Sequence, residues 1–231
     1  NHIIHLMRRN VNMQVIMFNN QIYGLTKGQY SPTSEKGKIT KSTPFGSLDH
    51  PFNPIALVLG ADASFVARSM DRDPKHMKEM LKASHAYQGT GFVEVYQNCN
   101  IFNDGAFFQY TEKATKSDRA IFIEHGKPLV YAGGKKGLRL EGFHLETVDL
   151  ESGGFGLDDC LVYDETSREL AGILSRVYWK EDLPQPFGIF YREKRPAYDV
   201  QVREQINAVI ERSGKGSLKQ LLEEGDTWEV N

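Results

Sequence analysis

The feature that most constrains the fold is an alternation of helical and strand patterns over residues 2–96. Apolar residues recur at helical spacing over about 2–9, and short apolar runs typical of buried strands lie at 13–18, 64–68 and 92–96. Strands that alternate with helices favour a mostly parallel sheet flanked by helices. We therefore expect an α/β fold with a Rossmann-like arrangement.

Two further helices in this segment have clear starting signals. Asn53 and Asp73 each stand immediately before a proline, which places a capping side chain just outside the first helical position. The first of these helices is expected to end at Gly60, and the second fades near Gly89. Between the first strand and Asn53, residues 21–52 are rich in Gly, Pro, Ser and Thr, so they predict a long loop of the kind that is often functional.

The pattern weakens beyond residue 100, where the chain is less regular. Short strands or extended arms are indicated at 120–123, 129–131 and 138–145, a strand at 188–191, and helices at about 167–177, 202–210 and 217–224. We expect a boundary near 104–118. The chain is therefore divided into residues 1–108 and a C-terminal α+β extension, residues 109–231, that makes subunit contacts.

Composition excludes several classes of protein. The formal net charge of −2 gives no reason to expect binding to nucleic acid. No apolar run reaches the ~18 residues of a membrane span, and no signal-peptide core is present. The chain opens inside a helical pattern, without Met and without a cap. We therefore expect the native protein to have residues upstream of Asn1.

Asn20 is the first candidate site residue. It follows the strand at 13–18, and ligands of parallel sheets bind outside the carboxyl ends of strands. A carboxamide oxygen and a backbone carbonyl two residues later are suitable Mg²⁺ ligands. Gly24 would allow close approach of the backbone to a phosphate. From these residues alone, an ordinary turn remains the alternative.

The wider sequence carries a resemblance to a known family. Residues 18–34 read FNNQIYGLTKGQYSPTS, residues 94–105 read EVYQNCNIFNDG, and shorter matches lie at 1–10, 42–44 and 51–54. These strings resemble the thiamine diphosphate (ThDP)-binding beta subunit of the 2-oxoacid:ferredoxin oxidoreductases. The likeness is dense over residues 1–108 and looser afterwards. It implies that residues 1–108 are the C-terminal part of a ThDP- and Mg²⁺-binding domain.

The resemblance implies specific roles in the first string. Asn20 would bind Mg²⁺ through its side chain, and Ile22 through its main-chain carbonyl. Gly24 and Leu25 would contact ThDP, with Thr26 near the diphosphate. The family's third protein ligand is the aspartate of a Gly-Asp-Gly motif, which would precede the first residue of this chain.

Lysines in the loop have two interpretations. By resemblance, Lys27 faces the substrate cavity and recognises a 2-oxoacid, because an ammonium suits a carboxylate, particularly the second one of a dicarboxylic substrate. A solvated surface lysine is the alternative. We interpret Lys36, Lys38 and Lys41 as solvated, with contact to an acidic electron carrier as their alternative.

The two cysteines are too few for a disulfide framework or for a complete four-thiolate metal site. A lone cysteine is most often a small buried apolar residue. By resemblance, however, Cys99 is the fourth ligand of a [4Fe-4S] cluster whose other thiolates come from an upstream segment. Cys160 matches no family motif and is interpreted as structural.

The resemblance implies an oxidoreductase of the cytoplasm. It would decarboxylate a 2-oxoacid with ThDP and Mg²⁺, form an acyl-coenzyme A, and pass electrons through the [4Fe-4S] cluster to ferredoxin. An alpha subunit would supply the aminopyrimidine half of the ThDP site, in an (αβ)₂ assembly.

The loop at 36–54 is most like that of 2-oxoglutarate-using members. Pyruvate or a broad 2-oxoacid range remains open. Two different classes of protein also remain open. One is a non-oxidative ThDP decarboxylase or synthase, which would leave Cys99 without a role, and the other is a non-catalytic assembly subunit.

Overall fold

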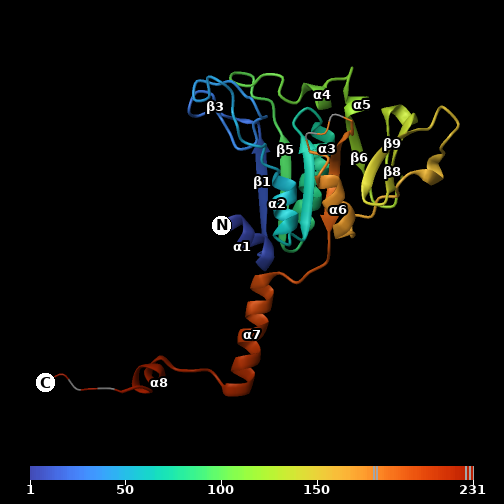
Figure 1. The fold of residues 1–231 in the computed structure, drawn as a ribbon. Coiled ribbons are helices and arrows are strands. Elements are labelled where there is room, and N and C mark those ends of the chain that lie inside the picture. Colours follow the sequence, from blue (N-terminus) through green and yellow to red (C-terminus); the bar gives the residue numbers. More distant parts are fainter. Residues whose placement is uncertain (179, 181, 227, 229, 231) are drawn as a thin grey trace.

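The computed structural model describes residues 1–178, 180, 182–226, 228 and 230. Within them a central five-stranded sheet has the order β1-β5-β4-β10-β6 (Figure 1). Its strands are β1 (Met13–Asn19), β4 (Phe65–Met70), β5 (Thr90–Tyr96), β6 (Ala120–Ile123) and β10 (Gln185–Arg192). The pairs β1–β5, β5–β4 and β10–β6 are parallel, and β10–β4 is antiparallel. The predicted α/β fold with a mostly parallel sheet is therefore confirmed.

Helices lie against this sheet where the sequence predicts them. They are α1 (His2–Arg9), α2 (Pro54–Gly60), α3 (Pro74–Ala86) and α6 (Arg168–Ser175). The side chains of Asn53 and Asp73 accept hydrogen bonds from the backbone N–H groups of Ala56 and His76, so both predicted caps form. Two predicted strands of this segment are longer than expected, because β4 continues to Met70 and β5 begins at Thr90.

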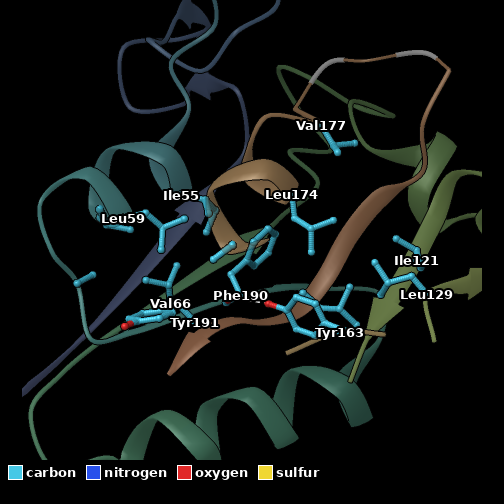
Figure 2. Packing of buried hydrophobic residues seen from close by; sticks show 14 of the residues in the cluster. Ile55, Leu59, Val66, Ile121, Leu129, Tyr163, Leu174, Val177, Phe190 and Tyr191 are labelled. Atoms are coloured by element: carbon cyan, nitrogen blue, oxygen red, sulfur yellow. Dashed lines mark hydrogen bonds between the residues drawn. The ribbon is translucent and has the colours of Figure 1, made fainter. Parts of the chain in front are cut away.

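The central strands β4 and β5 are buried on both faces of the sheet. Val66 of β4 packs with Ile55 of α2 and Leu174 of α6 (Figure 2). The neighbouring residues Phe65 and Ala67 belong to a second cluster, against which apolar residues of α3 pack. Because alternate side chains of a strand point to opposite faces, one strand contributes to two cores. This double packing makes the sheet a rigid support for the loops at its carboxyl edge.

Strands from both predicted segments share the central sheet, since β6 and β10 lie beyond residue 108. The division at residue 108 into functional parts stays a prediction. The less regular region contains α4 (Phe108–Thr111), α5 (Lys116–Arg119), η1 (Ala132–Gly134), η2 (Leu157–Asp159), and a separate sheet of β7 (Val130–Tyr131), β8 (Lys136–Glu141) and β9 (His144–Asp149).

The C-terminal helices form an arm. Helices α7 (Tyr198–Ser213) and α8 (Leu218–Glu223) lead away from the sheet (Figure 1). Both confirm helices predicted from the sequence. Ile206 and Val209 of the predicted apolar stripe are exposed. Over the described part of the chain, no helix has both the length and the apolar character needed to cross a membrane.

The cap of α2 gives a stability prediction. Asn53 accepts from Ala56 N and also donates through Nδ2 to the Ser175 carbonyl at 2.7 Å, which ties α2 to α6. Asn53→Ala should therefore lower the free energy of unfolding by about 1–2 kcal/mol in urea denaturation. Ser217→Ala removes a similar cap from the exposed helix α8 and should change it by less than about 0.5 kcal/mol. Equal effects would contradict the assignment of Asn53 as a link between core helices.

Candidate functional site

A buried ion pair anchors the carboxyl edge of the sheet. Arg68 Nε donates to Glu94 Oε2 at 2.7 Å, and both side chains are 0% exposed. Glu94 Oε1 accepts a hydrogen bond from Asn19 Nδ2 at 2.8 Å. These three residues lie on the adjacent strands β4, β5 and β1. The hydrogen bonds therefore cross the sheet and end at the last residue of β1.

Aromatic rings surround the Arg68 guanidinium. Its Cζ atom lies 5.0 Å from the ring centroids of both Tyr96 and Phe190. Nη1 donates to the Pro186 carbonyl at 3.3 Å, whereas Nη2 has no hydrogen-bond partner among the described residues. Glu94 and the ring faces together offset the cost of burying this cation.

Hydrogen bonds fix the turn that follows β1. Asn19 Oδ1 accepts from Thr33 Oγ1 at 2.7 Å and from Gln21 N at 3.3 Å. Asn20 Oδ1 accepts from Ile22 N at 3.2 Å. Gln21 has a φ of 55°, in the left-handed region, which costs a residue other than glycine about 1–2 kcal/mol. The surrounding bonds hold the backbone in this conformation.

A cavity of about 950 Å³ opens beside the turn. The antiparallel hairpin of β2 (Ile22–Tyr23) and β3 (Gln29–Tyr30) contributes to its wall. The lining includes the predicted metal and cofactor residues Asn20, Ile22, Gly24, Leu25 and Thr26. The structure thus brings these five residues to one cavity at the carboxyl end of β1, where parallel sheets bind their ligands.

Part of the long loop crosses over the hairpin. Tyr30 OH donates to Asp49 Oδ2 at 3.0 Å, and this hydrogen bond raises the pKa of the Tyr30 phenol. Both residues line a second cavity of about 640 Å³ that shares Tyr23 and Phe52 with the first. The predicted loop at 21–52 therefore forms walls of two adjoining cavities.

Cys99 lies in the loop after β5, beside the same turn. Its thiol is free and half-buried. Two hydrogen bonds tie this loop to the turn: Gln97 N donates to the Asn19 carbonyl, and Asn103 Nδ2 to the Asn20 carbonyl, each at 3.0 Å. The structure thus holds the loop that carries Cys99 against the turn that lines the cavity.

Cys160 is in a different environment. It is buried, and a Cβ built on Gly137 of β8 would come within 2.3 Å of its Sγ. Burial raises the pKa of its thiol, which disfavours the thiolate that a metal requires. These contacts fit the structural position predicted for Cys160. No group of three or more His, Cys, Asp or Glu residues in the described ranges could hold a metal ion.

Comparison with known proteins shows which proteins the chain is similar to. Residues 1–95 match the model for the thiamine pyrophosphate enzyme, C-terminal TPP binding domain, which includes the turn and the hairpin. The 2-oxoglutarate oxidoreductase subunit KorB of Mycobacterium tuberculosis is 44% identical over 236 residues, covering all of this chain and 62% of KorB. The chain is thus similar over its whole length to a 2-oxoglutarate oxidoreductase subunit, and its first 95 residues match a thiamine pyrophosphate binding domain.

Two further proteins are similar to the chain. The 2-oxoacid:ferredoxin oxidoreductase subunit beta of Saccharolobus solfataricus is 42% identical over 112 residues, which cover 48% of this chain and 37% of that protein. The solved 2-oxoglutarate:ferredoxin oxidoreductase from Magnetococcus marinus aligns with a TM-score of 0.66 and 25% identity, over 96% of this chain and 60% of that one. The chain therefore spans about three fifths of KorB and less of the archaeal subunit.

Lys27 does not line the cavity with the other predicted site residues. Its side chain is exposed and is not among those that line the cavity formed by the described residues. It ends the hairpin turn with a φ of 66°, and its N–H donates to the Gly24 carbonyl at 3.0 Å. The substrate role implied for Lys27 stays a prediction.

The interpretation of Lys38 as a solvated lysine is wrong. Lys38 Nζ donates to Glu35 Oε1 at 2.8 Å and to Asn103 Oδ1 at 2.6 Å, and its side chain is half-buried. Lys36 and Lys41 are exposed, as predicted. Loop composition cannot separate these three lysines, because the partner that distinguishes Lys38 lies 65 residues away in the chain.

The donor groups present fit the family's cofactor in part. A Cβ added at Gly24 would meet only Phe102, at 4.0 Å, so the glycine leaves open space where a diphosphate would approach the backbone. Asn20 and Ile22 offer oxygen donors of the type that Mg²⁺ takes. Cys99 could supply one thiolate of a cluster, and the described residues contain no further cysteine beside it.

The ion pair at the sheet edge yields a second prediction. Glu94→Gln keeps the acceptor for Asn19 but leaves the Arg68 charge unpaired, so the free energy of unfolding should fall by about 3–5 kcal/mol. In the double variant Arg68→Met/Glu94→Gln most of this loss should be recovered, because no buried charge remains. Urea denaturation of the wild type, of Glu94→Gln, of Arg68→Met and of the double variant measures the coupling.

A surface pair provides the control. Glu112→Gln breaks the exposed ion pair with Arg72 and should change the free energy of unfolding by less than about 1 kcal/mol. If Glu94→Gln were no more destabilising than Glu112→Gln, Glu94 would not be the counter-charge that Arg68 needs.

Proposed function

We propose that this chain holds Mg²⁺ and the diphosphate of ThDP in an enzyme that oxidatively decarboxylates 2-oxoglutarate to succinyl-coenzyme A. The observation that carries the proposal is the shared cavity of Asn20, Ile22, Gly24, Leu25 and Thr26. The likeness to KorB supports 2-oxoglutarate as the substrate. The solved relative from Magnetococcus marinus, which has 2-oxoglutarate, coenzyme A and succinyl-CoA bound, supports it too.

Asn20 and Ile22 are the proposed Mg²⁺ ligands. An amide oxygen has two lone pairs, and the hydrogen bond from Ile22 N uses one of those on Asn20 Oδ1. The second lone pair is then available to a cation. The carbonyl of Ile22 would add a second neutral oxygen, which suits a hard cation that also binds phosphate.

The hairpin supplies the cofactor contacts. Bound ThDP serves as an electron sink for decarboxylation of the 2-oxoacid. Gly24 admits the diphosphate close to the backbone, and the Thr26 hydroxyl, which donates to the Tyr23 carbonyl at 3.4 Å, retains lone pairs and lies on the same turn. Leu25, which is 96% exposed, offers an apolar surface to the cofactor.

Cys99 is proposed as one thiolate of a [4Fe-4S] cluster that carries electrons to ferredoxin, in the cytoplasm. The other ligands would lie outside the described residues, as would the aminopyrimidine site of an alpha subunit in an (αβ)₂ assembly. The half-buried thiol beside the cofactor turn supports this role. Absence of iron from the anaerobically purified full-length protein would contradict it.

Binding of Mg²⁺ and ThDP tests the site. Asn20→Ala in the full-length beta subunit with its alpha subunit should weaken Mg²⁺-dependent ThDP binding at least about tenfold by calorimetry, because a direct metal ligand is lost. Asn207→Ala, on the exposed face of α7, is the matched control and should leave the Kd within about twofold. Equal Kd values for the two variants would argue against Asn20 as a ligand.

Substrate choice is tested at Lys27. Lys27→Ala should lower kcat/KM for 2-oxoglutarate about tenfold or more while leaving pyruvate nearly unchanged, because only 2-oxoglutarate has a distal carboxylate. Lys36→Ala removes a neighbouring exposed lysine and should affect neither substrate. An equal fall in kcat/KM for both substrates would show that Lys27 does not recognise the distal carboxylate.

A further inference from the structure

Asn103 connects three loops at the carboxyl edge of the sheet. Its side chain is buried, and the residue is 6% exposed. Its backbone N–H donates to the Cys99 carbonyl at 2.9 Å, and its Nδ2 donates to the Asn20 carbonyl at 3.0 Å. Its Oδ1 accepts from Lys38 Nζ at 2.6 Å. One residue therefore contacts three segments. They are the turn that follows β1 (the cofactor turn), the loop after β5 that carries Cys99 (the cysteine loop) and the loop at residues 21–52 (the long loop).

The bond to the Asn20 carbonyl orients a strained peptide. This carbonyl belongs to the peptide that leads into Gln21, whose φ is 55°. On the other side, Gln21 N donates to Asn19 Oδ1. Asn103, which lies in the cysteine loop, thus fixes the plane of the peptide between Asn20 and Gln21. The residue after Gln21 is Ile22, which supplies the proposed carbonyl ligand. Losing the donor would let the turn relax toward ordinary backbone angles.

Two adjacent residues of the cysteine loop, Phe102 and Asn103, hold it against the hairpin and the turn. Asn103 closes the turn that begins at Cys99, and the two residues form an isolated β-bridge. The Phe102 ring packs against Gly28, where an added Cβ would lie 3.1 Å from Cδ1 of the ring. The backbone of Cys99 is thus linked to the hairpin through a single turn.

Lys38 determines which way the Asn103 amide points. An ammonium only donates hydrogen bonds, so the amide atom that faces Lys38 must be Oδ1. The Nδ2 group is then directed to the Asn20 carbonyl. Glu35 Oε1, 2.8 Å from Lys38 Nζ, holds the ammonium in place. The amide of Asn103 therefore has one orientation that satisfies both of its neighbours.

We propose that Asn103 is a positioning residue that sets the place of Cys99 relative to the Mg²⁺ and ThDP site. The inference rests on the proposed function, since it requires a cofactor at Asn20 and a cluster at Cys99. It goes beyond that function because it assigns a role to a residue that is a ligand of neither Mg²⁺ nor the cluster. One substitution at Asn103 should alter both sites at once.

The test uses the full-length beta subunit with its alpha subunit, purified anaerobically. Asn103→Asp is nearly isosteric and keeps an oxygen for Lys38, but it lacks the donor to the Asn20 carbonyl. We expect the Kd for ThDP in the presence of Mg²⁺ to rise about tenfold, and the electron paramagnetic resonance spectrum and midpoint potential of the reduced cluster to shift. Asn103→Ala should do the same, and Asn103→Asp keeps the test valid where the alanine variant does not fold.

Asn98→Ala is the matched control. Asn98 lies in the same loop, but among the described residues its side chain bonds only to Asp104 and Gly105 of that loop. It should leave the Kd for ThDP within about twofold. An equal rise in Kd for Asn98→Ala would overturn the inference, because general packing of the loop would then explain it.

The outcomes separate the two proposals. If the wild type binds Mg²⁺ and ThDP and contains the cluster, but Asn103→Asp changes only one site or neither, the positioning role is overturned and the proposed function stands. If the wild type binds no ThDP or contains no iron, the proposed function fails, and the positioning role fails with it. Lys38→Met should reproduce both shifts at smaller size, because the Asn103 amide loses its orienting partner.

Discussion

The site depends on the buried ion pair between Arg68 and Glu94. A charge without its partner in this position would cost several kcal/mol, so the pair strongly favours the strand register that places Arg68 opposite Glu94. A slip of one of these strands by one residue would turn its charge toward the opposite face of the sheet, against apolar side chains, and would leave the other charge without its partner. Glu94 extends this constraint to Asn19, the last residue of β1. The start of the turn that follows β1 is thereby fixed to the core.

Adjacent asparagines then take opposite tasks. Asn19 is 1% exposed, and its side-chain amide forms hydrogen bonds with Glu94, Thr33 and Gln21. Asn20 is half-buried and lines the cavity with its oxygen donors. The first residue secures the turn to the sheet, and the second is free to face a ligand. This separation explains how a long, polar loop can present a cavity with a defined wall.

Local signals predicted the helices and strands well, because caps and apolar periodicity act over a few residues. The Asn53 and Asp73 caps are examples. The placement of Asn20 after a strand was also predictable, whereas the roles in the hairpin came from the family resemblance. Pairings between distant residues were not predictable: Asn103 and Asn20 are 83 positions apart, and Arg68 and Glu94 are 26 apart. A single sequence shows charge and polarity at such positions but not their partners.

The exposed apolar residues around the cavity bear on how the site is completed. Phe18 and Leu25 line it with 62% and 96% of their surface exposed. Apolar side chains gathered at a cavity mouth are typical of surfaces that another protein covers. Decarboxylation also requires a site shielded from water, which an open cavity does not provide. The alpha subunit proposed above would meet both needs, since its half of the ThDP site would cover the wall that these residues leave exposed.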